Sequence, residues 1–118
     1  MQQPSSSSVR IHWLDSERTT EMLRVAVRQM MARQPEVERV LLFGSLARGQ
    51  AVPGSDADLL VVLSAADEPF IERIPSYLPT GAPIGVDVFP YTQPEIDRML
   101  AEGNHFIRRA LDEGVPLA

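Results

Sequence analysis

The chain contains no cysteine, and all 11 of its basic residues are arginine. The absence of cysteine excludes disulfides, thiolate zinc sites and cysteine nucleophiles. The absence of lysine excludes a phosphate-binding loop that depends on lysine and a covalent lysine–adenylate intermediate. Any chemistry on phosphates or metal ions must therefore use oxygen ligands, histidine or arginine.

Long hydrophobic runs and excess positive charge are also lacking. No apolar stretch approaches the roughly 20 residues of a membrane span, and residues 1–8 lack the apolar segment of a signal peptide. These absences predict a cytoplasmic location and no membrane partner. The net charge is -5 and the pI about 4.9. Broad electrostatic binding of DNA or RNA draws on Lys and Arg that neutralise phosphates, so no direct nucleic-acid binding is expected.

The length and composition predict one globular domain. The chain has 118 residues, 44% of them hydrophobic and 23% charged, which is typical of a soluble protein rather than a disordered one. It is too short for a catalytic domain plus a separate substrate domain. The polar, serine-rich start predicts a flexible tail over residues 1–10, and residues 11–118 form the predicted domain.

Helical patterns occur in both halves of the chain. The first begins at Asp15 or Ser16 and ends at Pro35. A second starts near Asp67 or Pro69, and we expect Pro75 and Pro79 to break it. The apolar positions of these two helices are Met22, Leu23, Ala26, Val27, Met30, Met31, Phe70, Ile71 and Ile74.

Two further helices are predicted near the end of the chain. Thr92 and Glu95 have the spacing of a capping box, and Gly103 is a natural terminator. Asn104 can cap a last helix that ends at Gly114. The apolar positions here are Ile96, Met99, Leu100, Phe106, Ile107, Ala110 and Leu111.

Short apolar runs predict three strands, at residues 37–43, 58–63 and 84–89. The first two are continuous and apolar, as expected of strands buried on both faces. Strands that alternate with helices predict a mixed sheet flanked by helices, in an α/β or α+β arrangement.

Three carboxylates stand at strand ends or inside apolar strands. Asp56 and Asp58 are two residues apart, so both side chains project to the same side of an extended chain. Asp87 lies between Val86 and Val88, and alternation sends it to the face opposite the two valines. If the second and third strands are neighbours, the three acids converge. Oxygen ligands without cysteine suit Mg²⁺ or Mn²⁺ rather than zinc.

Each acid also has a structural interpretation. Asp56 and Asp58 could cap or turn the corner at residues 53–55, as aspartate commonly does. Asp87 could form a salt bridge with an arginine.

A glycine and a serine follow the first predicted strand directly. Gly44 lets the backbone approach a ligand, and small residues leave amide N–H groups free to bind an anion. Ser45 adds a hydroxyl donor. Arg48 lies close by in sequence and could neutralise phosphate charge, although a loop arginine is often simply solvated.

Together these residues reproduce a longer signature: Gly44-Ser45, ten intervening residues, then Asp56-Ala57-Asp58. The arrangement resembles the DNA polymerase beta superfamily of nucleotidyltransferases. The wider strings Phe43-Gly44-Ser45-Leu46-Ala47-Arg48-Gly49 and Gly54-Ser55-Asp56-Ala57-Asp58-Leu59-Leu60-Val61 are similar to its minimal nucleotidyltransferase branch. Similarity extends from about the first helix to residues 108–114.

The resemblance implies a mixed sheet flanked by helices and a transfer of AMP from ATP to a hydroxyl. It implies that three acids bind Mg²⁺ or Mn²⁺ and act in catalysis, and that four other residues contact the triphosphate. The acids are Asp56, Asp58 and Asp87; the other four are Gly44, Ser45, Arg48 and Ser55. Asp87 is also the candidate base for the acceptor hydroxyl.

Three acceptor classes remain open. Relatives of this size often act as the antitoxin of a HEPN-type toxin by transferring AMP to one of its tyrosines. The chain could instead modify a small hydroxyl compound such as an antibiotic, with a second copy completing the pocket as a homo-oligomer. It could also be a non-catalytic binding module.

Overall fold

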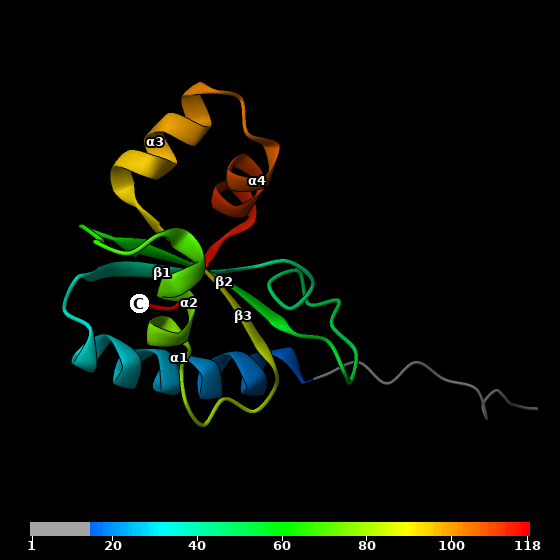
Figure 1. Cartoon of the computed structure of the whole chain (residues 1–118). Helices are drawn as coiled ribbons and strands as arrows, with labels where there is room; N and C mark the ends of the chain where they lie inside the picture. Colours follow the sequence, from blue (N-terminus) through cyan, green and yellow to red (C-terminus); the bar gives the residue numbers. More distant parts are fainter. Residues whose placement is uncertain (1–14) are drawn as a thin grey trace, which may run out of the picture.

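The computed structural model describes residues 15–118, so the tail predicted for residues 1–10 lies outside the described part. A four-stranded mixed sheet is covered by helices on both faces (Figure 1). The elements are α1 (Ser16–Arg33), β1 (Val37–Phe43), β2 (Ala57–Leu63), α2 (Phe70–Tyr77), β3 (Val86–Thr92), α3 (Gln93–Ala101), α4 (His105–Glu113) and β4 (Val115–Pro116). The α+β class predicted from the sequence is confirmed.

The strands lie in the order β3-β2-β1-β4. β1 pairs with β2 and with β4 in antiparallel fashion, whereas β2 and β3 are parallel. The parallel pair is connected by α2, which packs along β3. β3 and β4 are the two edge strands, and β2, which contains Asp58, is central.

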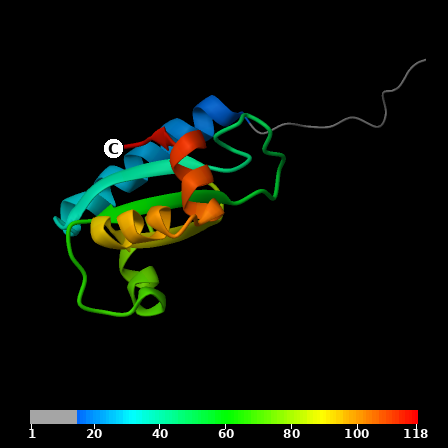
Figure 2. The same cartoon turned by 90° about the horizontal axis from the view of Figure 1, so that it is seen from above.

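Side chains alternate between two cores along the strands. Odd-numbered residues of β2, such as Leu59, face α1 and α2, whereas Leu60 and Val62 face α3 and α4. Figure 1 shows these layers from the side, with α3 and α4 on one face of the sheet and α1 on the other, and in Figure 2 α3 and α4 lie in front of the sheet. The face of an acid on β2 or β3 can therefore be assigned from its position in the alternation.

Local capping fixes where three of the helices begin. Asp15 accepts a hydrogen bond from the amide of Arg18 at the start of α1. Thr92 and Glu95 form the predicted capping box of α3. Asn104 caps α4 by accepting from the amide of Ile107. Each side-chain acceptor satisfies an amide that lacks a partner within the helix.

The expected bounds of two elements were wrong. α2 continues through Pro75 to Tyr77, because buried Arg73 and Tyr77 anchor it to the rest of the molecule. β3 begins two residues later than expected and extends to Thr92, with Pro90 tolerated because β3 is an edge strand.

β4 was not predicted at all, since it consists of two residues. Within the predicted apolar faces, Met22, Ile71 and Phe106 are exposed rather than buried, at 44%, 72% and 39%. None of the helices within residues 15–118 is long and apolar enough to cross a membrane.

Candidate active site at the end of the parallel strands

Asp58 and Asp87 are direct partners in the parallel pairing of β2 with β3. Directly opposed residues on adjacent strands project to the same face of a sheet. Asp58 lies two residues before Leu60, so the two side chains project to the same face of the sheet, the face covered by α3 and α4. The carboxylates of Asp58 and Asp87 therefore both lie on that face. The predicted neighbourhood of these two acids therefore follows from strand order and register.

Asp56 precedes β2 and is exposed. Its carboxylate lies directly against Gly85, where a Cβ atom would collide with Asp56 Oδ1. The Ala57 amide donates to the Gly85 carbonyl at 2.8 Å, which connects the two strand entrances. Gly85 was not singled out from the sequence. Its only signal in the sequence was a glycine inside the strand predicted for residues 84–89, two residues before Asp87.

Gly44 gives the same kind of space to Asp58. Its φ of 82° is in the left-handed region that favours glycine. A Cβ on Gly44 would lie 2.5 Å from Asp58 Oδ2. Two glycines thus leave room for two carboxylates, and both aspartates depend on a neighbouring residue without a side chain.

The electrostatics of the site are those of crowded acids. Burial raises the pKa of Asp58 above its ordinary value, and the nearby charges of Asp87 and Asp56 raise it further. Arg48 acts in the opposite direction. The ionised form of Asp58 is therefore disfavoured at this site, as expected where negative charges converge.

The structural interpretations of the acids are not seen in residues 15–118. The turn before β2 is closed by Ser55 Oγ, which accepts from the Val52 amide at 3.1 Å, rather than by Asp56 or Asp58. Asp87 forms no salt bridge with an arginine of this part of the chain. Asp56, Asp58 and Asp87 therefore remain free for a ligand.

The segment after β1 forms a tight turn. The Gly44 carbonyl accepts from the Arg48 amide and the Ser45 carbonyl from the Gln50 amide. The amides of Ser45, Leu46 and Ala47 donate to no backbone carbonyl within residues 15–118. Three donors at the start of a turn form the kind of nest that binds an anion.

Arg48 is not free in solvent. Its Nη1 atom lies 2.9 Å from Glu113 Oε1 of α4, and its Nε atom donates to Gln50 Oε1 at 3.2 Å. The ion pair is partly exposed, so it is weak and can exchange for a phosphate. Ser55, also predicted to contact the triphosphate, is engaged in its own turn.

The three acids imply a divalent ion, and their side chains must supply the ligand atoms that such an ion prefers. Within residues 15–118 no three His, Cys, Asp or Glu side chains stand together as a ready ligand group. The donors are nonetheless hard carboxylate oxygens, which suit Mg²⁺ or Mn²⁺. A cation would also relieve the repulsion that raises the pKa of Asp58. The residues fit such an ion, and their convergence around it stays a prediction.

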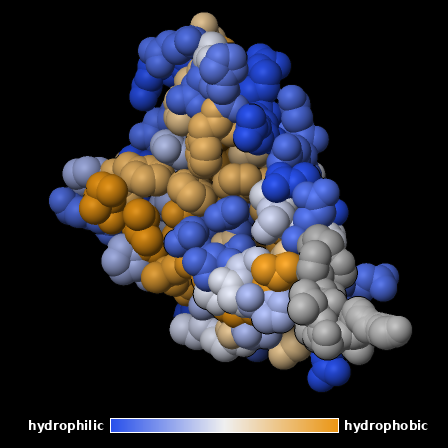
Figure 3. Space-filling view, turned by 90° about the vertical axis from the view of Figure 1, so that its right-hand side faces the viewer, coloured by the Kyte–Doolittle hydropathy of each residue, from blue (hydrophilic) through white to orange (hydrophobic). Residues whose placement is uncertain are grey.

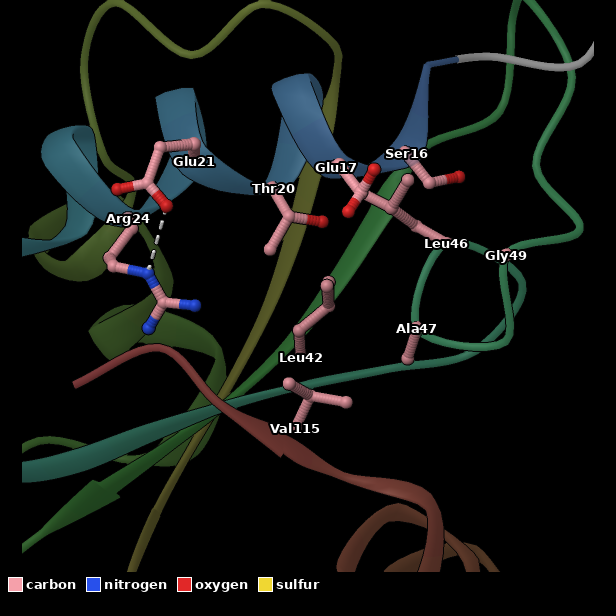
Figure 4. Close-up of a pocket in the computed structure, with 10 residues that line it drawn as sticks. All are labelled: Ser16, Glu17, Thr20, Glu21, Arg24, Leu42, Leu46, Ala47, Gly49 and Val115. Atoms are coloured by element: carbon pink, nitrogen blue, oxygen red, sulfur yellow. Dashed lines mark ion pairs between the residues drawn. The ribbon is translucent and has the colours of Figure 1, made fainter.

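The pocket shown in Figure 4 lies away from the acids. It has a volume of about 360 Å³ and is formed by α1, the turn after β1, and β4. Its strand residue Leu42 belongs to the core on the α1 face, opposite the face of Asp58. Leu46, Ala47 and Gly49 of the turn line this pocket, whereas none of the three acids does. The pocket therefore lies behind the turn and away from the acids.

Comparison with known proteins assigns a family to this arrangement. The model of the family described as "Nucleotidyltransferase domain" matches residues 23–115. A solved structure from Sulfolobus solfataricus, described as a "putative nucleotidyltransferase", is similar with 27% identity and a TM-score of 0.56. The alignment covers 70% of this chain and 75% of that chain. No curated protein matches.

Proposed function

Because this chain belongs to the nucleotidyltransferase domain family, we propose that it transfers AMP from ATP to a hydroxyl acceptor with Mg²⁺ or Mn²⁺ as cofactor. The observation that supports this most is the direct pairing of Asp58 with Asp87 beside the turn that begins at Gly44. Acids and a candidate phosphate site then lie on one side of the sheet.

Each residue has a proposed role. The amides after Gly44 and the Ser45 hydroxyl donate hydrogen bonds to the β- and γ-phosphates. Arg48 exchanges Glu113 for phosphate and neutralises charge. Asp56, Asp58 and Asp87 hold the divalent ion, which when bound neutralises the triphosphate and lowers the pKa of the acceptor hydroxyl.

Bond changes in the transfer are simple. The acceptor oxygen forms a bond to the α-phosphorus, the bond from the α-phosphorus to the bridging oxygen breaks, and pyrophosphate leaves. Asp87 takes the hydroxyl proton; its position on an edge strand leaves its carboxylate exposed to an incoming acceptor. Positioning and charge stabilisation supply most of the rate enhancement.

The acceptor we propose is a tyrosine hydroxyl of a HEPN-type partner protein, so that the chain acts as an antitoxin. A groove of about 320 Å³ next to β3 supports a protein acceptor. It is apolar except for Asp87, and its lining residues are Phe70, Ile74, Leu78, Val86, Asp87, Val88 and Phe89. An apolar surface beside the proposed base is typical of a protein contact.

Apolar residues also gather on the face seen in Figure 3, at its left and in its middle, beneath a polar upper part. Near the end of the chain, Ile107 and Leu117 are buried in the core, whereas Phe106 is 39% exposed. Phe106 alone of these three is available to a ligand.

Intact-mass spectrometry tests the proposed reaction. The purified chain is mixed with ATP, Mg²⁺ and the proposed partner, a HEPN-type protein whose gene neighbours that of the chain. We expect the partner to gain one AMP mass, with no gain for the Asp58→Asn variant and full gain for Asp97→Asn, an exposed control on α3.

Two results would contradict parts of the proposal. Gain of the mass by an aminoglycoside-like compound, with the protein unmodified, would show that the acceptor is wrong. No transfer to either acceptor, with Mg²⁺ or with Mn²⁺, would show that the proposed reaction is wrong.

A further inference from the structure

Three phenylalanine rings form a cluster beside the acids. Phe43 and Phe89 lie 5.6 Å apart between ring centroids, and Phe106 of α4 lies 5.6 Å from Phe43 and 5.0 Å from Phe89. Phe106 therefore connects β1 to β3 across the central strand. Aromatic packing alone explains their mutual contacts, but not the exposure of one ring.

The cluster is placed next to the reacting groups by register. Phe43 is the direct partner of Asp58 on the neighbouring strand. Phe89 follows Asp87 by two residues on the same strand, so its side chain projects to the same face. Phe43 is only 7% exposed, whereas Phe106 is 39% exposed. Phe106 is thus the most accessible of the three rings, and the acids lie beside the cluster.

α4 extends from this cluster to the phosphate-binding turn. Glu113, seven residues after Phe106, is paired with Arg48 of that turn. Seven residues correspond to about 10 Å along a helix, close to two turns, so the two side chains share one flank. Arg109 stands between them on that flank and is exposed. A triphosphate and ribose can span this distance.

We propose that Phe106 is the stacking platform for the nucleobase of the bound nucleoside triphosphate. The inference rests on the proposed function, and it names the side chain that binds the base. The phosphates lie at the turn of Ser45 and Arg48, and the nucleoside extends along α4 past Arg109. Because every base has an aromatic face, stacking distinguishes adenine from guanine poorly. Affinity for GTP is expected within a few-fold of that for ATP.

Calorimetric titration with Mg²⁺ present tests the platform, using ATP and tripolyphosphate as probes. Tripolyphosphate has the phosphates and lacks the base. Phe106→Leu should weaken ATP binding roughly 5- to 100-fold, the range expected for loss of base stacking, and should leave tripolyphosphate binding unchanged. Phe106→Tyr keeps the ring and should retain ATP affinity. Ile71→Ala, an exposed apolar control on α2, should bind both probes as the natural chain does.

Several outcomes would overturn the inference. Equal ATP affinity in Phe106→Leu and the natural chain would show that the ring does not contact the base. Equal weakening of ATP and tripolyphosphate would assign Phe106 a structural role, as would loss of ATP binding in Phe106→Tyr. If the natural chain binds tripolyphosphate as tightly as ATP, the base has no platform although the phosphate site stands. If it binds neither probe, the proposed function itself fails.

Discussion

At the scale of single residues, space for the acids comes from glycine. Gly44 and Gly103 have nearly equal positive φ values, 82° and 78°, but only Gly44 faces a carboxylate. Alanine at either position pays the same backbone cost, about 1 kcal/mol. The pair of variants therefore separates backbone strain from crowding of Asp58.

We predict that Gly44→Ala lowers nucleotidyl transfer at least about 10-fold, because a 1 Å displacement of a reacting group has effects of this size or larger. Gly103→Ala should lose similar stability and keep its transfer rate. Urea unfolding and a transfer assay on both variants provide the measurement. A parallel loss of rate in both would show that Asp58 tolerates the added methyl group.

The charge of Asp58 should cost the metal-free protein stability. Its pKa is raised in the folded state, so the penalty is absent below the ordinary value of 3.8 and is fully present above the folded pKa. We predict that Asp58→Asn is more stable than the natural chain at pH 7 in a chelator, and that the difference disappears at pH 3. Thermal melts at the two pH values measure it. Lower stability of the variant at pH 7 would indicate a structural role.

At the scale of elements, α2, β3 and α3 are joined by one buried arginine. Arg73 is 6% exposed and forms a two-pronged ion pair with Glu95, at 2.7 and 2.9 Å. It also donates to the carbonyls of Glu68 and Pro90. Glu95 in turn accepts from the Thr92 amide in the capping box of α3. The ion pair therefore fixes α2 against the strand that contains Asp87.

We predict that Glu95→Gln lowers the free energy of unfolding by about 2–3 kcal/mol, somewhat below the range for a fully buried pair because Glu95 is partly exposed. The hydrogen bond to Arg73 holds the pKa of Glu95 at about 2. The stabilisation should therefore be present above pH 4.5 and lost as the pH falls towards 2.

Urea unfolding at pH 7 and pH 3 measures this loss. The matched control is Glu72→Gln, which removes a neighbouring exposed carboxylate from α2. If the difference in unfolding free energy between Glu95→Gln and the natural chain is the same at both pH values, the ion pair with Arg73 is not the cause of the loss.

Some features of the site follow from local sequence patterns, whereas others depend on tertiary contacts. Asp58 and Asp87 could be found because alternation and spacing are local properties, and the family signature contains them. Gly85 could not, since its importance depends on which strand lies beside Asp56. β4 has two residues and is defined by its partner β1. The stop expected at Pro75 failed because the burial of Arg73 is a tertiary contact with no local pattern.

At the scale of the whole molecule, the proposed reaction predicts linked binding of nucleotide and metal. ATP with Mg²⁺ should raise the melting temperature, since a ligand at 100 times its Kd adds about 2.7 kcal/mol. ATP in a chelator should give little increase, because the phosphates then meet the unneutralised acids. Differential scanning fluorimetry measures both, with Asp58→Asn as the variant that loses the metal-dependent part. If ATP raises the melting temperature equally with Mg²⁺ and with a chelator, the nucleotide and the metal do not share a site.

The two outer edges of the sheet have a common construction. Pro90 stands on β3, and its carbonyl accepts from Arg73; Pro116 stands on β4, and its carbonyl accepts from Arg24 at 3.1 Å. Neither proline has an amide hydrogen, and both outward carbonyls are occupied by guanidinium groups. A further strand from a second molecule would find no donor or free acceptor at these points. Self-association by extending the sheet, including fibril growth from its edges, is therefore opposed on both sides.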